Sequence, residues 1–187
     1  MSATSATNAG SRNPGTRYLI GAIACLSILA AGAIWLLMPQ TTRTNPYPLA
    51  TMTLPNLRAN ASEVRFGGKR ERPLVINFFF SDCVGCVTEL PRIEAAAKKW
   101  TGQIDIVGVD HFEPRASGAD FAAKTGITFP VGWDQTGEFA PLVGVNAFPA
   151  TLFVDKEGIV RRRVLGQISE QRLNSELQQL FMSSHVN

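Results

Sequence analysis

LVINFFFSDCVGCVTELP, residues 74–91, joins a short apolar run to two cysteines that are separated by two residues. The run at 74–80 is interrupted only by Asn77, and its length is typical of a strand buried on both faces of a sheet. Beyond the cysteines, the alanines at 95–97 and the lysines at 98–99 favour a helix with cations near its C-terminus. The sequence therefore predicts a strand followed by a helix, with both cysteines at the junction.

The position of the two cysteines determines the chemistry expected of them. Unpaired amides and the helix dipole favour an anion at a helix N-terminus, so a thiol there ionises more readily than an ordinary cysteine. We expect Cys83 to be the exposed nucleophile. Cys86, one turn inside the helix, is then expected to be the resolving thiol that attacks the mixed disulfide.

Two non-redox interpretations of the cysteine pair are weaker. A structural zinc site needs two more ligands, but the other candidates, Cys25, His111 and His185, are widely separated and follow no ligand pattern. A purely structural disulfide that closes such a short loop gains little chain entropy. The sequence therefore predicts a redox-active pair, with no metal site and no bound cofactor.

The N-terminal part of the chain differs in composition from the rest. Residues 1–17 are rich in Ser, Thr, Ala and Asn, which predicts a disordered tail. Residues 18–38 contain no charge and are long enough to cross a bilayer as a helix. An extended linker is expected at 39–50 and a single domain at 51–187.

The charges beside the apolar segment predict its orientation. Arg12 and Arg17 precede it and Arg43 follows it, so the positive-inside rule places the N-terminus in the cytoplasm. Cleavage near residues 31–33 is an alternative, but the apolar run continues beyond that point and favours an uncleaved anchor. We therefore expect a single-pass membrane protein whose domain lies outside the cytoplasm.

The charge balance argues against a nucleic-acid partner. All 15 acidic residues and 16 of the 18 basic residues lie beyond residue 17, because only Arg12 and Arg17 precede it. The outer domain consequently has almost no net charge, although the whole chain has a pI of about 9.0.

Periodicity and turn residues predict the other elements of the domain. A strand pair is expected at 51–54 and 63–66, and a strand at 104–109 that runs parallel to the first apolar strand. The following elements are a short helix at 120–124, an extended segment at 129–131, a helical turn at 137–142, a hairpin of 150–154 with 159–165, and a last helix capped by Ser169. This order predicts an α/β fold.

Three segments are more specific than the cysteines alone: LVINF at 74–78, GITFPV at 126–131 and GVNAFPATLFVD at 144–155. With the cysteine motif, they resemble the thioredoxin-like superfamily and, within it, the TlpA/ResA/CcmG branch of membrane-anchored thiol-disulfide oxidoreductases. The resemblance extends over residues 49–181. It implies a central mixed sheet flanked by helices, with an N-terminal strand pair and one preceding transmembrane helix.

The resemblance also implies roles for residues outside the cysteine motif. Pro149 matches the family's cis-proline, which packs against the disulfide and leaves the backbone of the preceding Phe148 free to pair with an extended substrate. Glu113 matches an acidic position near the disulfide, where it would tune thiol ionisation or relay a proton to Cys86. A solvated loop carboxylate is the alternative for Glu113.

Asp82 departs from the family, which usually has Trp at that position. A carboxylate beside Cys83 opposes thiolate formation, so we expect a more reducing pair than one flanked by Trp. Asp82 is alternatively the N-cap of the helix. The family also commonly has a smaller residue in place of Phe148 and a proline between the cysteines, where Val84 and Gly85 stand here.

The expected function is reduction of disulfides in extracytoplasmic proteins, of the cytochrome c or copper-site maturation type, with re-reduction by a membrane electron donor. This direction comes from the resemblance alone. The alternatives are a disulfide oxidant, a peroxide-reducing redoxin and a Cu(I)-binding chaperone. The peroxide-reducing class requires Thr or Ser three residues before its cysteine, where Phe80 stands here.

Overall fold

The computed structural model describes residues 45–183. The predicted tail at 1–17, the predicted anchor at 18–38 and the first half of the predicted linker, residues 39–44, lie outside this range and stay predictions. None of the helices within residues 45–183 is long and apolar enough to span a membrane.

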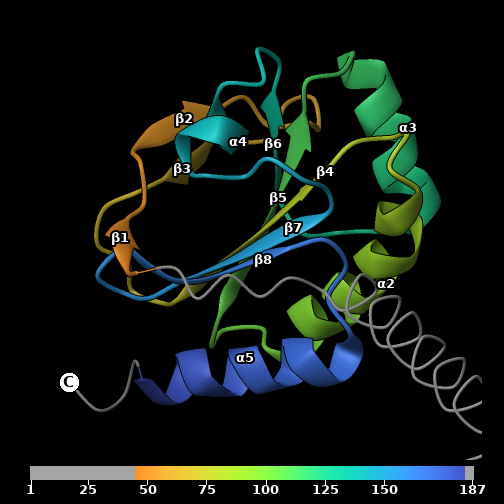
Figure 1. Cartoon of the computed structure of the whole chain (residues 1–187). Coiled ribbons are helices and arrows are strands. Elements are labelled where there is room, and N and C mark those ends of the chain that lie inside the picture. The colour runs from red at the N-terminus through yellow and green to blue at the C-terminus, as the bar shows by residue number, and fades with distance from the viewer. Residues whose placement is uncertain (1–44, 184–187) are drawn as a thin grey trace, which may run out of the picture. The chain divides into compact units, whose positions relative to one another are not determined.

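A six-stranded mixed sheet forms the centre of the domain, with strand order β1-β8-β7-β4-β5-β6 (Figure 1). β4 (Leu74–Phe79) is parallel to β5 (Asp105–His111) and antiparallel to β7 (Ala150–Val154). β6 (Val131–Asp134) extends the sheet beyond β5, and β8 (Ile159–Leu165) pairs with β7. Every residue of β4 is buried, which confirms the prediction from its apolar run.

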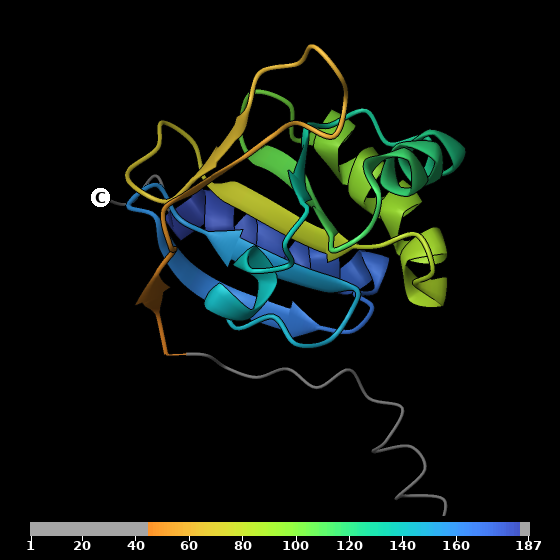
Figure 2. The ribbon, with the colours of Figure 1, turned by 90° about the horizontal axis from the view of Figure 1, so that it is seen from above.

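Three helices pack against one face of this sheet (Figure 2). They are α2 (Val84–Lys99), α3 (Arg115–Thr125) and α5 (Glu170–Ser183). Both cysteines belong to the hydrophobic core on this face. The core therefore holds the start of α2 firmly against the sheet.

The other face is covered by a strand pair and a short helix. β2 (Met52–Leu54) and β3 (Val64–Phe66) pair in antiparallel fashion, which confirms the predicted N-terminal strand pair. α4 (Phe139–Leu142) contributes Phe139, whose ring contacts Phe66 with a centroid distance of 4.5 Å. The predicted thioredoxin-like α/β arrangement of the domain is confirmed.

The solvated linker predicted at 39–50 ends earlier than expected. β1 (Tyr47–Pro48) pairs with β8, and Leu49 is only 4% exposed. The Tyr47 hydroxyl also donates to the carbonyl of Val143 at 2.7 Å. A strand of two residues has no periodicity, so only its distant pairing partners identify it.

The helix predicted at 120–124 begins five residues earlier, at Arg115. Gly118 lies inside it and is a poor helix former, which obscures the helical pattern in the sequence. The predicted end at Gly126 is confirmed, because this glycine adopts the left-handed conformation with φ of 71°.

Candidate active site

The two cysteines form a disulfide at the N-terminus of α2. Their Cα atoms are 5.3 Å apart, and Cys83 is the N-cap of the helix. The Cys86 amide donates to Cys83 Sγ at 3.2 Å. The predicted strand-to-helix junction is therefore confirmed, and the N-cap alternative for Asp82 is wrong, because Cys83 itself occupies that position and Asp82 is exposed.

Cys83 is less exposed than the sequence predicts. It is 5% exposed in the disulfide form, whereas Cys86 is completely buried. Both residues belong to the hydrophobic core between the helices and the sheet, and Phe80 and Phe148 pack against the same core. Of the two sulfurs, that of Cys83 belongs to the more accessible residue, which agrees with the predicted order of attack.

A cis peptide bond joins Phe148 to Pro149 at the start of β7. Pro149 is buried and lies against the cysteine motif, because a Cβ atom added at Gly85 would be only 3.0 Å from Pro149 Cδ. Gln167 closes the same space and donates to the carbonyl of Gly85 at 2.7 Å. The space at Gly85 is tight, since a Cβ there would require Pro149 or Gln167 to shift by a few tenths of an ångström.

Glu89 is a buried acid that the sequence analysis missed. It is fully buried in α2, and it accepts hydrogen bonds from Asn77 Nδ2 at 2.7 Å and from the Ile168 amide at 2.6 Å. Burial raises the pKa of Glu89 to about 7, although both hydrogen bonds oppose that rise. Glu89 stands three residues after Cys86, so helical spacing places the two side chains on one face.

Glu113 lies beside the loop before Cys83. One carboxylate oxygen accepts from the Ser81 amide at 2.7 Å, and the other accepts from the Ser81 hydroxyl. Its hydrogen bonds therefore go to Ser81 and not to a cysteine, so Glu113 holds the loop in place. The alternative of a freely solvated carboxylate is wrong for the same reason.

Asp110, at the end of β5, is a second buried acid that the sequence did not reveal. It is fully buried, and neither of its carboxyl oxygens has a hydrogen-bond donor among the described residues. Burial, followed by the nearby acids Glu113 and Asp134, raises the pKa of Asp110 to about 9. At neutral pH this carboxyl is therefore protonated.

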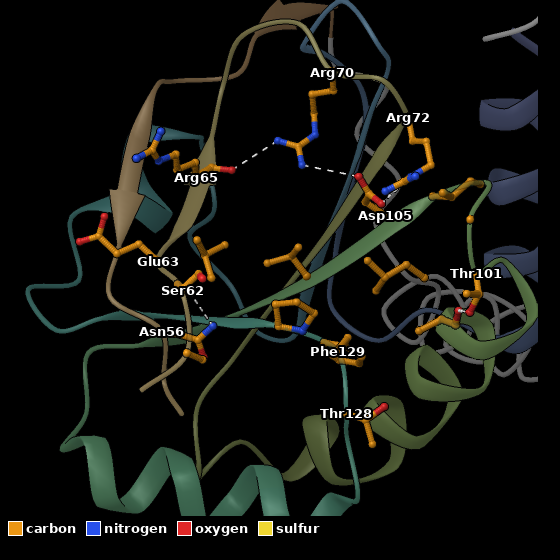
Figure 3. A pocket seen from close by; sticks show the side chains of 18 of the residues that line it. Asn56, Ser62, Glu63, Arg65, Arg70, Arg72, Thr101, Asp105, Thr128 and Phe129 are labelled. Carbon is orange, nitrogen blue, oxygen red and sulfur yellow. Dashed lines mark hydrogen bonds and ion pairs between the residues drawn. The ribbon is translucent and has the colours of Figure 1, made fainter. Parts of the chain in front are cut away.

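The cavity drawn in Figure 3 lies away from the disulfide. It has a volume of about 730 Å³ and opens near the starts of β4 and β5, whereas the cysteines follow the end of β4. Arg70 and Arg72 point toward Asp105 on its wall, with nitrogen–oxygen distances of 3.7 and 2.8 Å. None of the predicted site residues lines this cavity. Within residues 45–183, no cluster of three or more His, Cys, Asp or Glu side chains is arranged to hold a metal ion.

A comparison with protein families matches residues 47–163 to the AhpC/TSA family, which is more than half of the chain. The chain belongs to the AhpC/TSA family. This assignment includes the cysteine motif and the cis-proline segment.

Individual relatives support the same assignment. The thiol-disulfide oxidoreductase ResA of Geobacillus thermodenitrificans is 26% identical over 119 residues, which are 63% of this chain and 68% of the relative. The thiol:disulfide interchange protein DsbE of Pseudomonas fluorescens biotype C is 23% identical over 141 residues, 75% of this chain and 76% of the relative. The predicted resemblance and the predicted enzyme class, thiol-disulfide oxidoreductase, are confirmed.

A solved structure shows the same fold. The DsbF homologue of Corynebacterium diphtheriae superposes with a TM-score of 0.66 at 18% identity, and the match covers 75% of this chain and 92% of the homologue. This similarity shows that the domain has the same fold as the homologue.

Proposed function

We propose that the protein reduces disulfide bonds of extracytoplasmic proteins through Cys83 and Cys86. The observation that carries the proposal is the disulfide at the N-terminus of α2, with Cys83 as N-cap and the cis Pro149 against Gly85. The names of the ResA and DsbE relatives support thiol-disulfide exchange as the reaction. The direction, reduction of the partner, follows the resemblance to the TlpA/ResA/CcmG branch.

The reaction begins with the reduced protein. The Cys83 thiolate attacks one sulfur of the partner's disulfide and expels the other as a thiolate, which forms a mixed disulfide. The Cys86 amide and the N-terminus of α2 stabilise negative charge on Cys83 Sγ. Cys86 then attacks Cys83 Sγ, closes the intramolecular disulfide and releases the second partner thiol. The partner gains two electrons and two protons, and the cysteine pair loses them.

Cys86 must lose its proton before it attacks, and it is completely buried. Glu89 is suited to accept that proton, because it lies on the same helix face and its pKa is near 7. Its hydrogen bonds to Asn77 and Ile168 fix the carboxylate in position. Glu89 therefore takes the relay role that the sequence analysis had assigned to Glu113.

The setting of the reaction is part of the same proposal. The uncharged segment at 18–38 anchors the protein in the bacterial inner membrane, with its N-terminus in the cytoplasm and its catalytic domain in the periplasm. A membrane electron donor returns two electrons to the disulfide after each turnover. Partners of the cytochrome c or copper-site maturation type present their disulfides on the same side of the membrane.

The test is the reduction potential of the Cys83–Cys86 pair in the full chain, measured by equilibration with thiol buffers. We expect a value at or below about −250 mV, near the reducing end of the range for thioredoxin-like proteins. A value near about −120 mV would assign the protein as an oxidant. Two further measurements on the same sample test the remaining alternatives. Consumption of hydrogen peroxide tests the peroxide-reducing redoxin, and the amount of Cu(I) that the reduced protein binds tests the copper chaperone.

A further inference from the structure

A row of four ring side chains leads away from the cysteine turn. Phe80 lies edge-on to Phe148 with ring centroids 5.4 Å apart, and Phe148 stacks on His111 at 4.7 Å. His111 in turn is 6.2 Å from the ring of Phe112. We refer to Phe80, Phe148, His111 and Phe112 as the aromatic row.

The aromatic row begins at the disulfide. The Cys83 amide donates to the carbonyl of Phe80 at 3.2 Å, and Phe148 directly precedes the cis Pro149. Phe79 pairs with Asp110 in the parallel register of β4 and β5, so the residues that follow these two run side by side. Phe80 and Phe148, the two rings at this end of the row, also pack against the hydrophobic core that contains both cysteines.

Phe112 ends the row in solvent. Its side chain is 68% exposed, and its backbone adopts a left-handed conformation with φ of 49°, which is unfavourable for a bulky residue. The structure holds this conformation, because the Phe112 amide donates to the Asp134 carbonyl at 3.0 Å. The chain at Gly137 also lies close behind it, since a Cβ added there would be 3.0 Å from Phe112 Cβ. The ring is thus presented to solvent by a constrained backbone.

The side chain that follows Cys83 is also apolar and exposed. Val84 is 86% exposed, although it is the first residue of α2. Val84 directly follows Cys83, and Phe112 is connected to the cysteine turn through the rings of His111, Phe148 and Phe80, so both exposed apolar side chains belong to the surroundings of the same disulfide. An extended segment whose disulfide reaches Cys83 would contact Val84 and the row.

Building on the proposed thiol-disulfide exchange, we infer that the aromatic row selects partner segments that carry an aromatic or large aliphatic side chain next to the reactive cysteine. Phe148 would contact the segment close to the cysteine, and Phe112 would contact the neighbouring side chain. A ring contact of this kind favours binding by more than its buried area alone. Phe148 and Phe112 are therefore specificity-determining residues of the site.

The test compares two synthetic peptides, each with one internal disulfide, that differ only in having Phe or Gly next to the first cysteine. Single-turnover rates with each peptide are measured for the reduced full-length wild type and for each variant. Each rate is divided by the rate of the same protein with glutathione disulfide, which corrects for differences in general thiol reactivity. We expect the Phe peptide to react about five- to tenfold faster than the Gly peptide, as one ring contact allows. The variants Phe112→Asn and Phe112→Gly should bring this ratio close to one, because both remove the ring. Asn and Gly are chosen because both tolerate the left-handed backbone at this position.

Met182→Asn is the matched control, because Met182 is 58% exposed at the far end of α5 and lies outside the row. It should keep the wild-type ratio. Equal rates for the two peptides with wild-type protein, or an unchanged ratio in both Phe112 variants, would overturn the inference while the proposed function stood. If the wild-type protein reacted with neither peptide nor glutathione disulfide, the proposed function itself would be wrong, and the inference with it.

Discussion

Glu89 in α2 and Asp110 in β5 are both fully buried carboxyls close to the cysteine turn, but different groups surround them. Glu89 accepts hydrogen bonds from Asn77 and from the Ile168 amide. Asp110 has no donor to either oxygen within the described part of the chain, and its charged neighbours are the acids Glu113 and Asp134. Burial raises both pKa values, to about 7 for Glu89 and to about 9 for Asp110.

This difference shows that hydrogen-bond donors decide what a buried carboxyl can do. The two donors keep the charged form of Glu89 accessible, so it exchanges a proton near neutral pH. Asp110 stays protonated there, and the nearby Glu113 accepts hydrogen bonds from the amide and the hydroxyl of Ser81. Glu89 is therefore suited to proton exchange near neutral pH, whereas Asp110 is not.

The largest expected effect is loss of stability in Glu89→Ala. The substitution leaves the Ile168 amide as a buried donor without an acceptor. It also removes the shortest hydrogen bond of Asn77 Nδ2, which keeps those to Thr151 Oγ1 and the Ala150 carbonyl, and it opens a cavity beside Cys86. We expect the free energy of unfolding of the oxidised protein to fall by about 4 kcal/mol. Urea denaturation monitored by tryptophan fluorescence measures this change. A loss below about 1 kcal/mol would show that the Ile168 amide finds another partner.

The second prediction concerns the pH dependence of stability. Since the pKa of Glu89 is about 7 in the folded protein and that of an ordinary glutamate is about 4.5, the folded protein holds this proton more tightly than the unfolded chain. The stabilisation from this group is fully present below pH 4.5 and is lost as the pH rises through 7, a change of about 3 kcal/mol.

Glu89→Gln removes this titration. The difference in unfolding free energy between the wild type and Glu89→Gln should therefore change by about 3 kcal/mol between pH 4.5 and 7.5. Asn77 can rotate its amide, whose oxygen is unpartnered, to accept from the new side-chain NH₂ group. A difference that is constant with pH would place the titration on another group.

The sequence predicts the fold better than it predicts these acids. The apolar run of β4 and the periodicity of α2 are local patterns, so they identify the cysteine junction directly. Burial of Glu89 depends on Ile168, which is 79 residues away, and only the helical spacing from Cys86 hinted at it. Asp110 looks like an ordinary strand-end acid in the sequence, because its burial arises where Gly118 of α3 packs against it. The cis Pro149 was predicted from the family resemblance and not from spacing.

The smallest expected effect belongs to Asp110→Asn, and its sign is opposite to that of Glu89→Ala. Because of the raised pKa, Asp110 ionises at pH 7 in the unfolded chain but not in the folded protein, and this ionisation stabilises the unfolded chain. Asn has the same size, stays neutral in both states and can donate its NH₂ group to Glu113. We therefore expect the variant to be more stable than the wild type by about 2 kcal/mol at pH 7 and no more stable near pH 4. Urea denaturation at the two pH values checks this, and a variant less stable than wild type at pH 7 would mean that Asp110 has a donor of its own and resembles Glu89 after all.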